Sequence, residues 1–264
     1  MYTASRRTRH RASWQTLTKV PKITAFFWTI KILTTGMGES ASDFLDHRFN
    51  PYFAGAVGLI AFIIALVLQF KQERYRPWVY WFAVAMVAVF GTMAADGLHV
   101  ELGVPYIASS LFYAVVLIIV FAAWYKYEGT LSIHSIHTPR REAFYWLTVL
   151  ATFAMGTALG DLTASTFSLG YLGSGVLFAV MFALPGLGYW IFRTNSILAF
   201  WLAYIITRPL GASFADWMGV PKDLGGLNWG RGMVSLGLTG LIIIIVAFVA
   251  ATREDSPTQR KGDT

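Results

Sequence analysis

Four aspartates occupy one position of a pattern that recurs along the chain. Each lies fifteen residues after the Trp of an aromatic–Trp pair, and these pairs are Phe27-Trp28, Tyr80-Trp81, Tyr145-Trp146 and Phe200-Trp201. The aspartates are Asp43, Asp96, Asp161 and Asp216. Carboxylate oxygens are the ligands that hard cations prefer, and crowded carboxylates also take up protons. These residues therefore predict a site where a cation, such as a divalent metal ion, competes with protons.

A glycine follows each of the same Trp residues by ten positions, and a small residue lies four positions further on. The pairs are Gly38/Ser42, Gly91/Ala95, Gly156/Gly160 and Gly211/Ala215. Small residues at this spacing lie on one face of a helix and let a neighbouring helix approach closely. We expect these glycines to pack the helices that carry the aspartates.

The pattern defines four repeats, whose Trp residues are 53, 65 and 55 residues apart. Each repeat holds a motif-bearing helix and a second, more apolar helix. If every repeat crosses a membrane twice, the four motif helices run in the same direction and bring their aspartates to one level, as an acidic ring. A second interpretation is that each Asp ends its helix at the surface, either solvated or capping the next turn.

Three further charges share the face of the motif helices that carries the Trp and the Asp: Lys31, Glu39 and Arg208. At 100° per residue they lie within about 60° of the Trp. Glu39 precedes Asp43 by one turn and joins the predicted ion-binding residues. We expect Glu39 and Arg208 to pair and Arg208 and Lys31 to gate the site. The alternatives for Lys31 and Arg208 are a structural salt bridge or snorkelling, and Pro209 is expected to kink or break its helix.

The charged and small residues of the repeats must be carried by membrane-spanning helices. The chain of 264 residues is 56% hydrophobic and 13% charged, which falls outside the range of ordinary soluble domains. A bilayer crossing takes about 20 apolar residues. Six runs approach this length, at 52–70, 78–95, 106–125, 144–159, 172–192 and 233–251. The segments 23–44 and 197–217 are as long but interrupted by charge or proline, and the repeats make them the first and seventh helices.

The predicted fold is an all-α membrane protein. Eight transmembrane helices form four parallel helical-hairpin repeats around a pseudo-fourfold axis along the membrane normal. A basic tail precedes one transmembrane domain, and a disordered tail follows it. The predicted ranges are 1–22 for the first tail, 23–251 for the domain, about 23–76, 77–141, 142–196 and 197–251 for its repeats, and 252–264 for the second tail.

The basic residues predict the orientation. Of the 21 Lys and Arg, 16 fall on the side of the termini, 3 in loops on the other side and 2 in spans. Since Lys and Arg accumulate in cytoplasmic segments, both termini are expected in the cytoplasm, with the four repeat Trp residues as aromatic-belt anchors near that face. The net charge of +7 follows from this topology and from anionic lipid, so the expected partner is the lipid bilayer and not nucleic acid.

Other kinds of chemistry find no support. The sequence has no Cys, which excludes disulfides, thiolate metal sites and cysteine nucleophiles. It has no nucleophile elbow, no phosphate-binding Gly-rich loop after a strand and no zinc-binding helix motif. We therefore expect neither an enzyme nor a resident cofactor, only a bound cation.

The repeated F/Y-W…G-x(4)-D pattern, together with LSIHSIHTPRREAFYWLTVLATFAMGTALGDL over residues 131–162, resembles a bacterial family of uncharacterised membrane proteins. That family is built from four tandem repeats of unknown function, each with two transmembrane segments and a characteristic tryptophan. The resemblance spans residues 19–251. It implies the eight-helix, four-repeat fold and a bacterial inner-membrane location, and it implies no substrate.

We therefore expect a secondary transporter that moves a small cation against protons, with the four aspartates as its translocation site. Two alternatives stay open. One is a transporter or binding protein for a small organic solute, in which the aromatic pairs line a cavity and Arg208 meets an anionic group. The other is a non-transporting scaffold whose basic tail binds a cytosolic partner. Eight helices in one chain suffice to enclose a site, so the sequence sets no oligomeric state.

Overall fold

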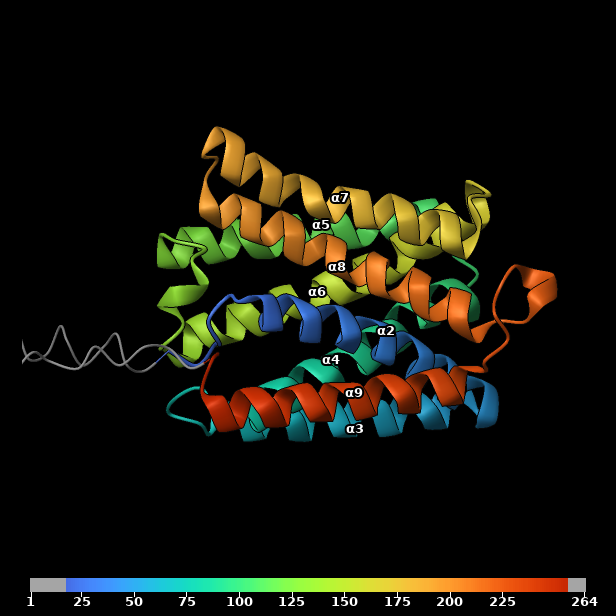
Figure 1. The fold of residues 1–264 in the computed structure, drawn as a ribbon, viewed down its shortest axis with the longest axis horizontal. Coiled ribbons are helices and arrows are strands. Elements are labelled where there is room, and N and C mark those ends of the chain that lie inside the picture. The colour runs from blue at the N-terminus through green and yellow to red at the C-terminus, as the bar shows by residue number, and fades with distance from the viewer. Residues whose placement is uncertain (1–17, 256–264) are drawn as a thin grey trace, which may run out of the picture.

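The computed structural model describes residues 18–255, and this part of the chain is helical and contains no strand. Eight long α-helices lie side by side along the long axis of the molecule (Figure 1). They are α2 (Ala25–Arg48), α3 (Pro51–Phe70), α4 (Pro77–Asp96), α5 (Tyr106–Glu128), α6 (Pro139–Asp161), α7 (Gly170–Phe192), α8 (Ser196–Gly219) and α9 (Arg231–Thr252). The prediction of an all-α fold is confirmed.

The helices begin and end where the sequence carries capping signals. Thr24 before α2 and Thr138 before α6 each accept a hydrogen bond from a backbone N–H three residues on. Asn50 and Asn195 do the same before α3 and α8. These side chains satisfy N–H groups that the first turn leaves without an intrahelical partner. After α5, Gly129 has a φ of 68°, the left-handed conformation that ends a helix without a Cβ clash.

Pro209 lies inside α8 and does not break it. The helix runs from Ser196 to Gly219 without interruption, so the predicted break at this proline is wrong. A proline removes one backbone hydrogen bond and crowds the preceding turn. Gly156 of α6 leaves room for the proline ring, since a Cβ at Gly156 would lie 2.9 Å from Pro209 Cδ.

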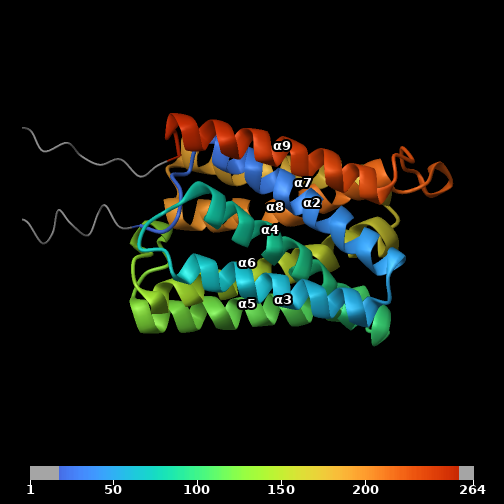
Figure 2. The ribbon, with the colours of Figure 1, turned by 90° about the horizontal axis from the view of Figure 1, so that it is seen from below.

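The motif-bearing helices α2, α4, α6 and α8 form the interior of the bundle, and we call them the inner helices. They contact one another in a closed order, α2 with α4, α4 with α6, α6 with α8, and α8 with α2. The second helices of the repeats are the outer helices. Each packs mainly on the inner helix of the following repeat: α3 on α4, α5 on α6 and α7 on α8. The last outer helix, α9, packs on α2, so the last repeat packs on the first (Figure 2).

The repeat glycines make the inner helices approach closely. In each case a Cβ on the glycine would fall within 3 Å of the next inner helix, on the residue seven positions after that helix's Trp. The pairs are Gly38 with Ala88, Gly91 with Phe153, Gly156 with Arg208, and Gly211 with Thr35. The predicted packing role of these glycines is therefore confirmed, because a side chain at any of them would force two helices apart.

Seven of the eight described helices are long and apolar enough to cross a membrane. The exception is α2, which carries Lys31, Glu39 and Asp43 among its 24 residues. Every outer helix exposes large apolar side chains along its length. Examples are Ile60, Ile119, Val180 and Ile244. Soluble monomeric proteins rarely expose so large an apolar surface to water, so these helices indicate a membrane protein.

The described chain begins and ends at the same end of the bundle, which we call the terminal end (Figure 1). Backbone hydrogen bonds of 2.9 to 3.1 Å tie residues 18–22 to the segments around them there. They join Tyr75 to Thr18, Lys19 to Ile136, and Lys22 to Asp255. This short segment therefore packs against the bundle.

A buried ion pair holds the same segment in place. Lys19 Nζ lies 2.6 Å from Glu142 Oε2, and Gln69 Nε2 donates to the other oxygen of Glu142 at 3.0 Å. Lys19 Nζ also donates to the Phe70 carbonyl at 3.2 Å. Both charges are buried, and each compensates the other, which removes the large cost of an isolated buried charge.

The predicted tails, 1–22 and 252–264, lie mostly outside the described residues, which exclude 1–17 and 256–264. At the described C-terminal end, the Tyr75 hydroxyl donates a hydrogen bond to the carboxylate of Asp255. Burial raises the pKa of Tyr75, and the neighbouring Asp255 carboxylate raises it further. The phenol therefore keeps its proton and remains a donor at any physiological pH.

Substitution of Gly38 by Ala is expected to destabilise the protein, because the new Cβ would lie 2.4 Å from Ala88 Cβ and 2.8 Å from the Ala88 carbonyl carbon. Overpacking of this kind costs about 1–3 kcal/mol. The measurement is the thermal unfolding midpoint of the purified protein in detergent. Gly237→Ala in α9 is the matched control, because nothing lies within 4 Å of its new Cβ. Equal midpoints for the two variants would contradict close packing at Gly38.

Candidate functional site

Side chains spaced four residues apart along the inner helices face the interior of the bundle. Four residues of α-helix turn by about 400°, which is one full turn plus about 40°. Positions 3, 7, 11 and 15 after each Trp therefore lie on nearly the same face of the helix. The four aspartates at position 15 all line one cavity of about 710 Å³ at the end opposite the terminal end. We call it the acidic cavity. Its lining also includes Glu39, Asp46, His47, Tyr106, Tyr171 and Arg231.

Three carboxylates of this cavity lie closest together. Oxygens of Glu39, Asp161 and Asp216 are all within 4.8 Å of one another, and we call these residues the carboxylate cluster. Glu39 and Asp216 are buried, and Asp161 is half-buried. Within residues 18–255, the side chains of Asp161 and Asp216 have no hydrogen-bond or ion-pair partner. Since like charges this close repel each other, a cation or protons would stabilise the cluster.

Asp96 and Asp161 do not cap the helices that they end. Each is the last residue of its α-helix, but the chain continues as a five-residue π-helical segment, Gly97–Glu101 or Leu162–Thr166. Neither carboxylate makes a capping hydrogen bond within the described chain. The capping alternative is therefore wrong for these two aspartates, which face the acidic cavity instead.

Asp43 differs from the other three repeat aspartates because a cation from the protein lies against it. Arg231 Nε, at the start of α9, is 2.8 Å from Asp43 Oδ2. Arg231 Nη1 also lies 3.2 Å from His47 Nε2, and His47 Nδ1 lies 2.7 Å from the Asp43 carbonyl. A carbonyl only accepts, so Nδ1 carries the proton and Nε2 accepts from Arg231. Arg231 thus compensates Asp43, and no pattern in the sequence had indicated this partner.

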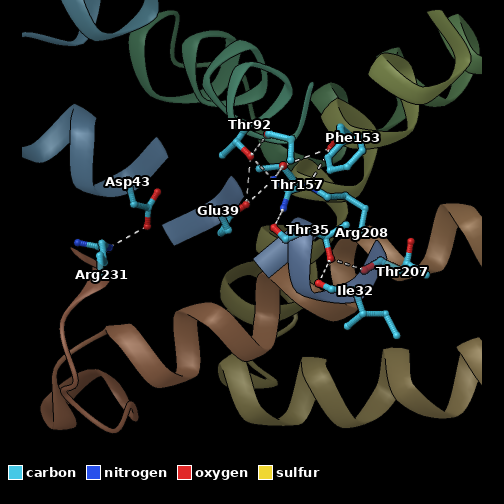
Figure 3. A network of polar contacts seen from close by, with 11 residues as sticks. Ile32, Thr35, Glu39, Asp43, Thr92, Phe153, Thr157, Thr207, Arg208 and Arg231 are labelled. Carbon is cyan, nitrogen blue, oxygen red and sulfur yellow. Dashed lines mark hydrogen bonds and ion pairs between the residues drawn. The ribbon is translucent and has the colours of Figure 1, made fainter. Parts of the chain in front are cut away.

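Arg208 lies beneath the carboxylate cluster with its side chain fully buried. Its Nη2 is 2.5 Å from Glu39 Oε2, and it donates to Thr157 Oγ1 at 2.6 Å and to Thr92 Oγ1. Its Nη1 donates to the Thr35 carbonyl at 2.7 Å, as Figure 3 shows. The predicted pair between Glu39 and Arg208 is therefore present, and it joins all four inner helices. A guanidinium keeps its proton in proteins, so Arg208 is a fixed positive charge beneath the carboxylate cluster, bonded to Glu39 and outside the cavity lining.

The two threonines that bind Arg208 escaped the sequence analysis. Thr92 and Thr157 lie eleven residues after Trp81 and Trp146, which is the position of Glu39 after Trp28. Polar residues at three equivalent positions on an inward face are a signal for a shared interaction. Comparing the repeats at position 11, and not only at positions 10 and 15, would have found them.

Lys31 is enclosed by aromatic rings. Its ammonium nitrogen is 4.0 Å from the ring centroid of Phe153 and 4.3 Å from that of Tyr204. The side chain is buried, and none of the described residues accepts a hydrogen bond from it. Both alternatives expected for Lys31, a salt bridge and snorkelling, are wrong, because the inner helices hold its head group between two ring faces, which attract a cation. Its gating role stays a prediction.

The repeat tryptophans pack inside the bundle. Trp81, Trp146 and Trp201 are buried, and Trp28 is half-buried. The prediction that they are aromatic-belt anchors is wrong for the three buried ones, because rings of neighbouring helices cover them. The Phe27 ring lies 5.8 Å from Trp81, and the Trp201 indole N–H donates to the Leu131 carbonyl at 2.9 Å. These rings fill the inner bundle toward the terminal end.

A family model described as Repeat of Unknown Function (DUF347) matches the chain four times, over residues 26–75, 79–130, 144–195 and 199–255. Each match begins one residue before an aromatic–Trp pair and covers most of one inner helix with the outer helix that follows it. The prediction of four tandem repeats is therefore confirmed. Neither the curated proteins nor the solved structures contain a match to this chain.

Replacing Arg208 by Met is expected to lower the free energy of unfolding by about 3–5 kcal/mol, because Glu39 would remain buried without a counter-charge. Adding Glu39→Gln to Arg208→Met is expected to recover part of this loss. Unfolding of the single and double variants in detergent measures the coupling. Arg231→Met is the comparison, since its ion pair is partly exposed and should contribute about 0–1 kcal/mol. If the double variant is no more stable than Arg208→Met, Glu39 and Arg208 are not energetically coupled.

Proposed function

The chain belongs to the family described as Repeat of Unknown Function (DUF347), a description that names no activity, and we propose from the chain's own residues that it is a secondary transporter. It moves a small cation across the membrane in exchange for protons. In this proposal the protein is a carrier and not an enzyme, and it needs no resident cofactor. The cargo binds in the acidic cavity.

The observation that carries the proposal is the carboxylate cluster. Glu39, Asp161 and Asp216 come from α2, α6 and α8 and converge within 4.8 Å. Asp96 lines the same cavity, so every inner helix supplies a carboxylate. A charge inside a membrane protein costs a few kcal/mol to insert and marks a functional site by default. Oxygen-rich clusters of this kind favour cations.

Protons supply the coupling in this proposal. A carboxylate binds either a proton or a cation, so cargo that enters the cluster displaces protons, and protons that return displace the cargo. Arg208 adds a fixed positive charge beneath the cluster, which limits how tightly a cation is held and so permits its release. Asp43 lines the same cavity, and in this structure Arg231 compensates its charge.

We further propose that α2 crosses the membrane as the eighth span. It has 24 residues, like α8, and it packs against α4, α8 and α9. The closed order of the inner helices and the matching glycine contacts support the pseudo-fourfold axis along the membrane normal. The excess of Lys and Arg on the side of the termini supports a cytoplasmic location for both termini, in a bacterial inner membrane.

A carrier must expose its site to each side of the membrane in turn. The acidic cavity reaches the surface at Tyr52 and Leu102, both of which are exposed. On the other side, the buried Lys19–Glu142 pair and the packed tryptophans close the bundle. This arrangement corresponds to the outward-facing state of the proposed carrier.

The two alternative functions have less support. Arg208 is bonded to Glu39 and does not line the acidic cavity, and neither do the repeat tryptophans. The organic-solute alternative assigned its binding to those residues. The scaffold alternative depends on the basic tail, of which residues 1–17 lie outside the described chain.

The proposal predicts that the purified protein binds a small cation and releases protons as it does so. Asp216→Asn is expected to weaken binding by about tenfold or more, because it removes one charge of the cluster. Isothermal titration with metal and ammonium ions, in buffers of different ionisation enthalpy, measures both the affinity and the protons released. Uptake into liposomes under a pH gradient then measures transport.

Asp223→Asn is the matched control, because it makes the same charge change at an exposed residue that does not line the cavity. It should bind cations as the wild type does. A wild type that binds no cation at any pH would contradict the proposal. Binding without flux into liposomes would retain the cation site and refute transport.

A further inference from the structure

The acidic cavity is larger than a metal site requires, and part of its lining is apolar. Its volume of about 710 Å³ lies within the range of small-molecule sites and far above the roughly 30 Å³ that one water molecule occupies. Met93, Tyr106 and Tyr171 line it beside the carboxylates. They present a thioether and aromatic rings, which a metal ion does not need and an organic cation can contact.

The carboxylate cluster matches the donors of a primary ammonium group. Such a group has three N–H donors, and the cluster offers three carboxylates whose oxygens lie within 4.8 Å of one another. Three acceptors at about 2.8 Å from one nitrogen would lie about 4.6 Å apart, in keeping with this spacing. Asp216, only 8% exposed, lines the cavity and has no partner among the described side chains, so its carboxylate is available to a ligand.

The protein itself places an organic cation at a second position in this cavity. The Arg231 guanidinium lines the cavity and lies against Asp43, at 2.8 Å from Nε to Oδ2. Figure 3 shows this pair set apart from the contacts of Arg208. Asp43 follows Glu39 by one helical turn, which is a rise of about 6 Å. The cavity therefore has two cation positions about one turn apart, and a side chain occupies the outer one.

We propose that the acidic cavity binds a linear diamine, and that this is the cargo class of the proposed transporter, on which the inference rests. One ammonium group binds the carboxylate cluster, and the other binds Asp43 in place of Arg231. An extended chain of five bonds separates the nitrogens of a four-carbon diamine by about 6 Å, which matches one helical turn. The methylene groups lie against the aromatic and thioether part of the lining. Arg231 is then a tethered competitor for the outer position.

The test is isothermal titration of the full-length protein in detergent with 1,4-diaminobutane, butylamine and Mn²⁺ as separate probes. The diamine is expected to bind about tenfold or more tightly than butylamine, because its second ammonium adds a charged hydrogen bond. Asp216→Asn is expected to weaken binding of both amines. Asp43→Asn is expected to bring the affinity for the diamine down to that for butylamine.

Arg231→Gln is the most specific variant, because it removes the competitor and keeps Asp43. It is expected to tighten binding of the diamine severalfold, and to tighten binding of butylamine less, because only the diamine spans the cluster and Asp43 together. Lys222→Gln is its matched control, since it removes the same charge from an exposed residue that precedes α9 and does not line the cavity. Thermal unfolding checks that each variant is folded, and Asp161→Asn replaces Asp216→Asn if the latter does not fold.

The outcomes separate this inference from the function on which it rests. If Mn²⁺ binds and neither amine does, the diamine is overturned and the cation transporter stands. If none of the three probes binds, both are overturned. Two results would overturn the second cation position and the diamine proposal that depends on it. One is equal affinities for the diamine and butylamine, and the other is an Arg231→Gln variant that binds the diamine no more tightly than the wild type.

Discussion

A single buried guanidinium links the four inner helices. Arg208 of α8 receives its counter-charge from Glu39 of α2 and hydrogen-bond acceptors from Thr92 of α4 and Thr157 of α6. Because the side chain is fully enclosed, a slip of any of these helices would leave polar groups buried without partners, at a cost of several kcal/mol. The interaction therefore fixes how the inner helices are positioned relative to one another along the bundle axis. It thereby brings the four aspartates together about one turn beyond Glu39.

Close approach of the inner helices makes this interaction possible. Lipid gives no hydrophobic drive between membrane helices, so small residues at the contacts decide which helices meet. Gly156 lies against Arg208 itself, and Gly211 lies against the turn of α2 that holds Thr35. The outer helices add a second constraint, since each packs on the inner helix of the next repeat and α9 packs on α2. The four repeats thus depend on one another, and no repeat encloses a site alone.

The differences between the repeats shape the cavity more than their likeness does. Four equivalent aspartates would form an even ring, but single-copy residues divide it. Glu39 brings one carboxylate inward to join Asp161 and Asp216, and Arg231 compensates Asp43 at the mouth. Toward the terminal end, Lys19 and Glu142 form a buried ion pair, and Lys31 is held between two aromatic rings. The acidic cavity is therefore the place where carboxylates outnumber the cations that the described chain supplies.

The sequence by itself determined the repeats, the all-helical fold and the face of each inner helix that turns inward, because these follow from spacing along the chain and from the 3.6-residue turn. It also sufficed to pair Glu39 with Arg208, since opposite charges at similar heights on neighbouring parallel helices meet. It did not determine the burial of Trp81, Trp146 and Trp201, which depends on the rings that neighbouring helices bring against them. Only the tertiary structure decided that Arg231 meets Asp43 and that Lys19 meets Glu142, because these partners come from segments without periodicity, whose position is set by packing at the ends of the bundle.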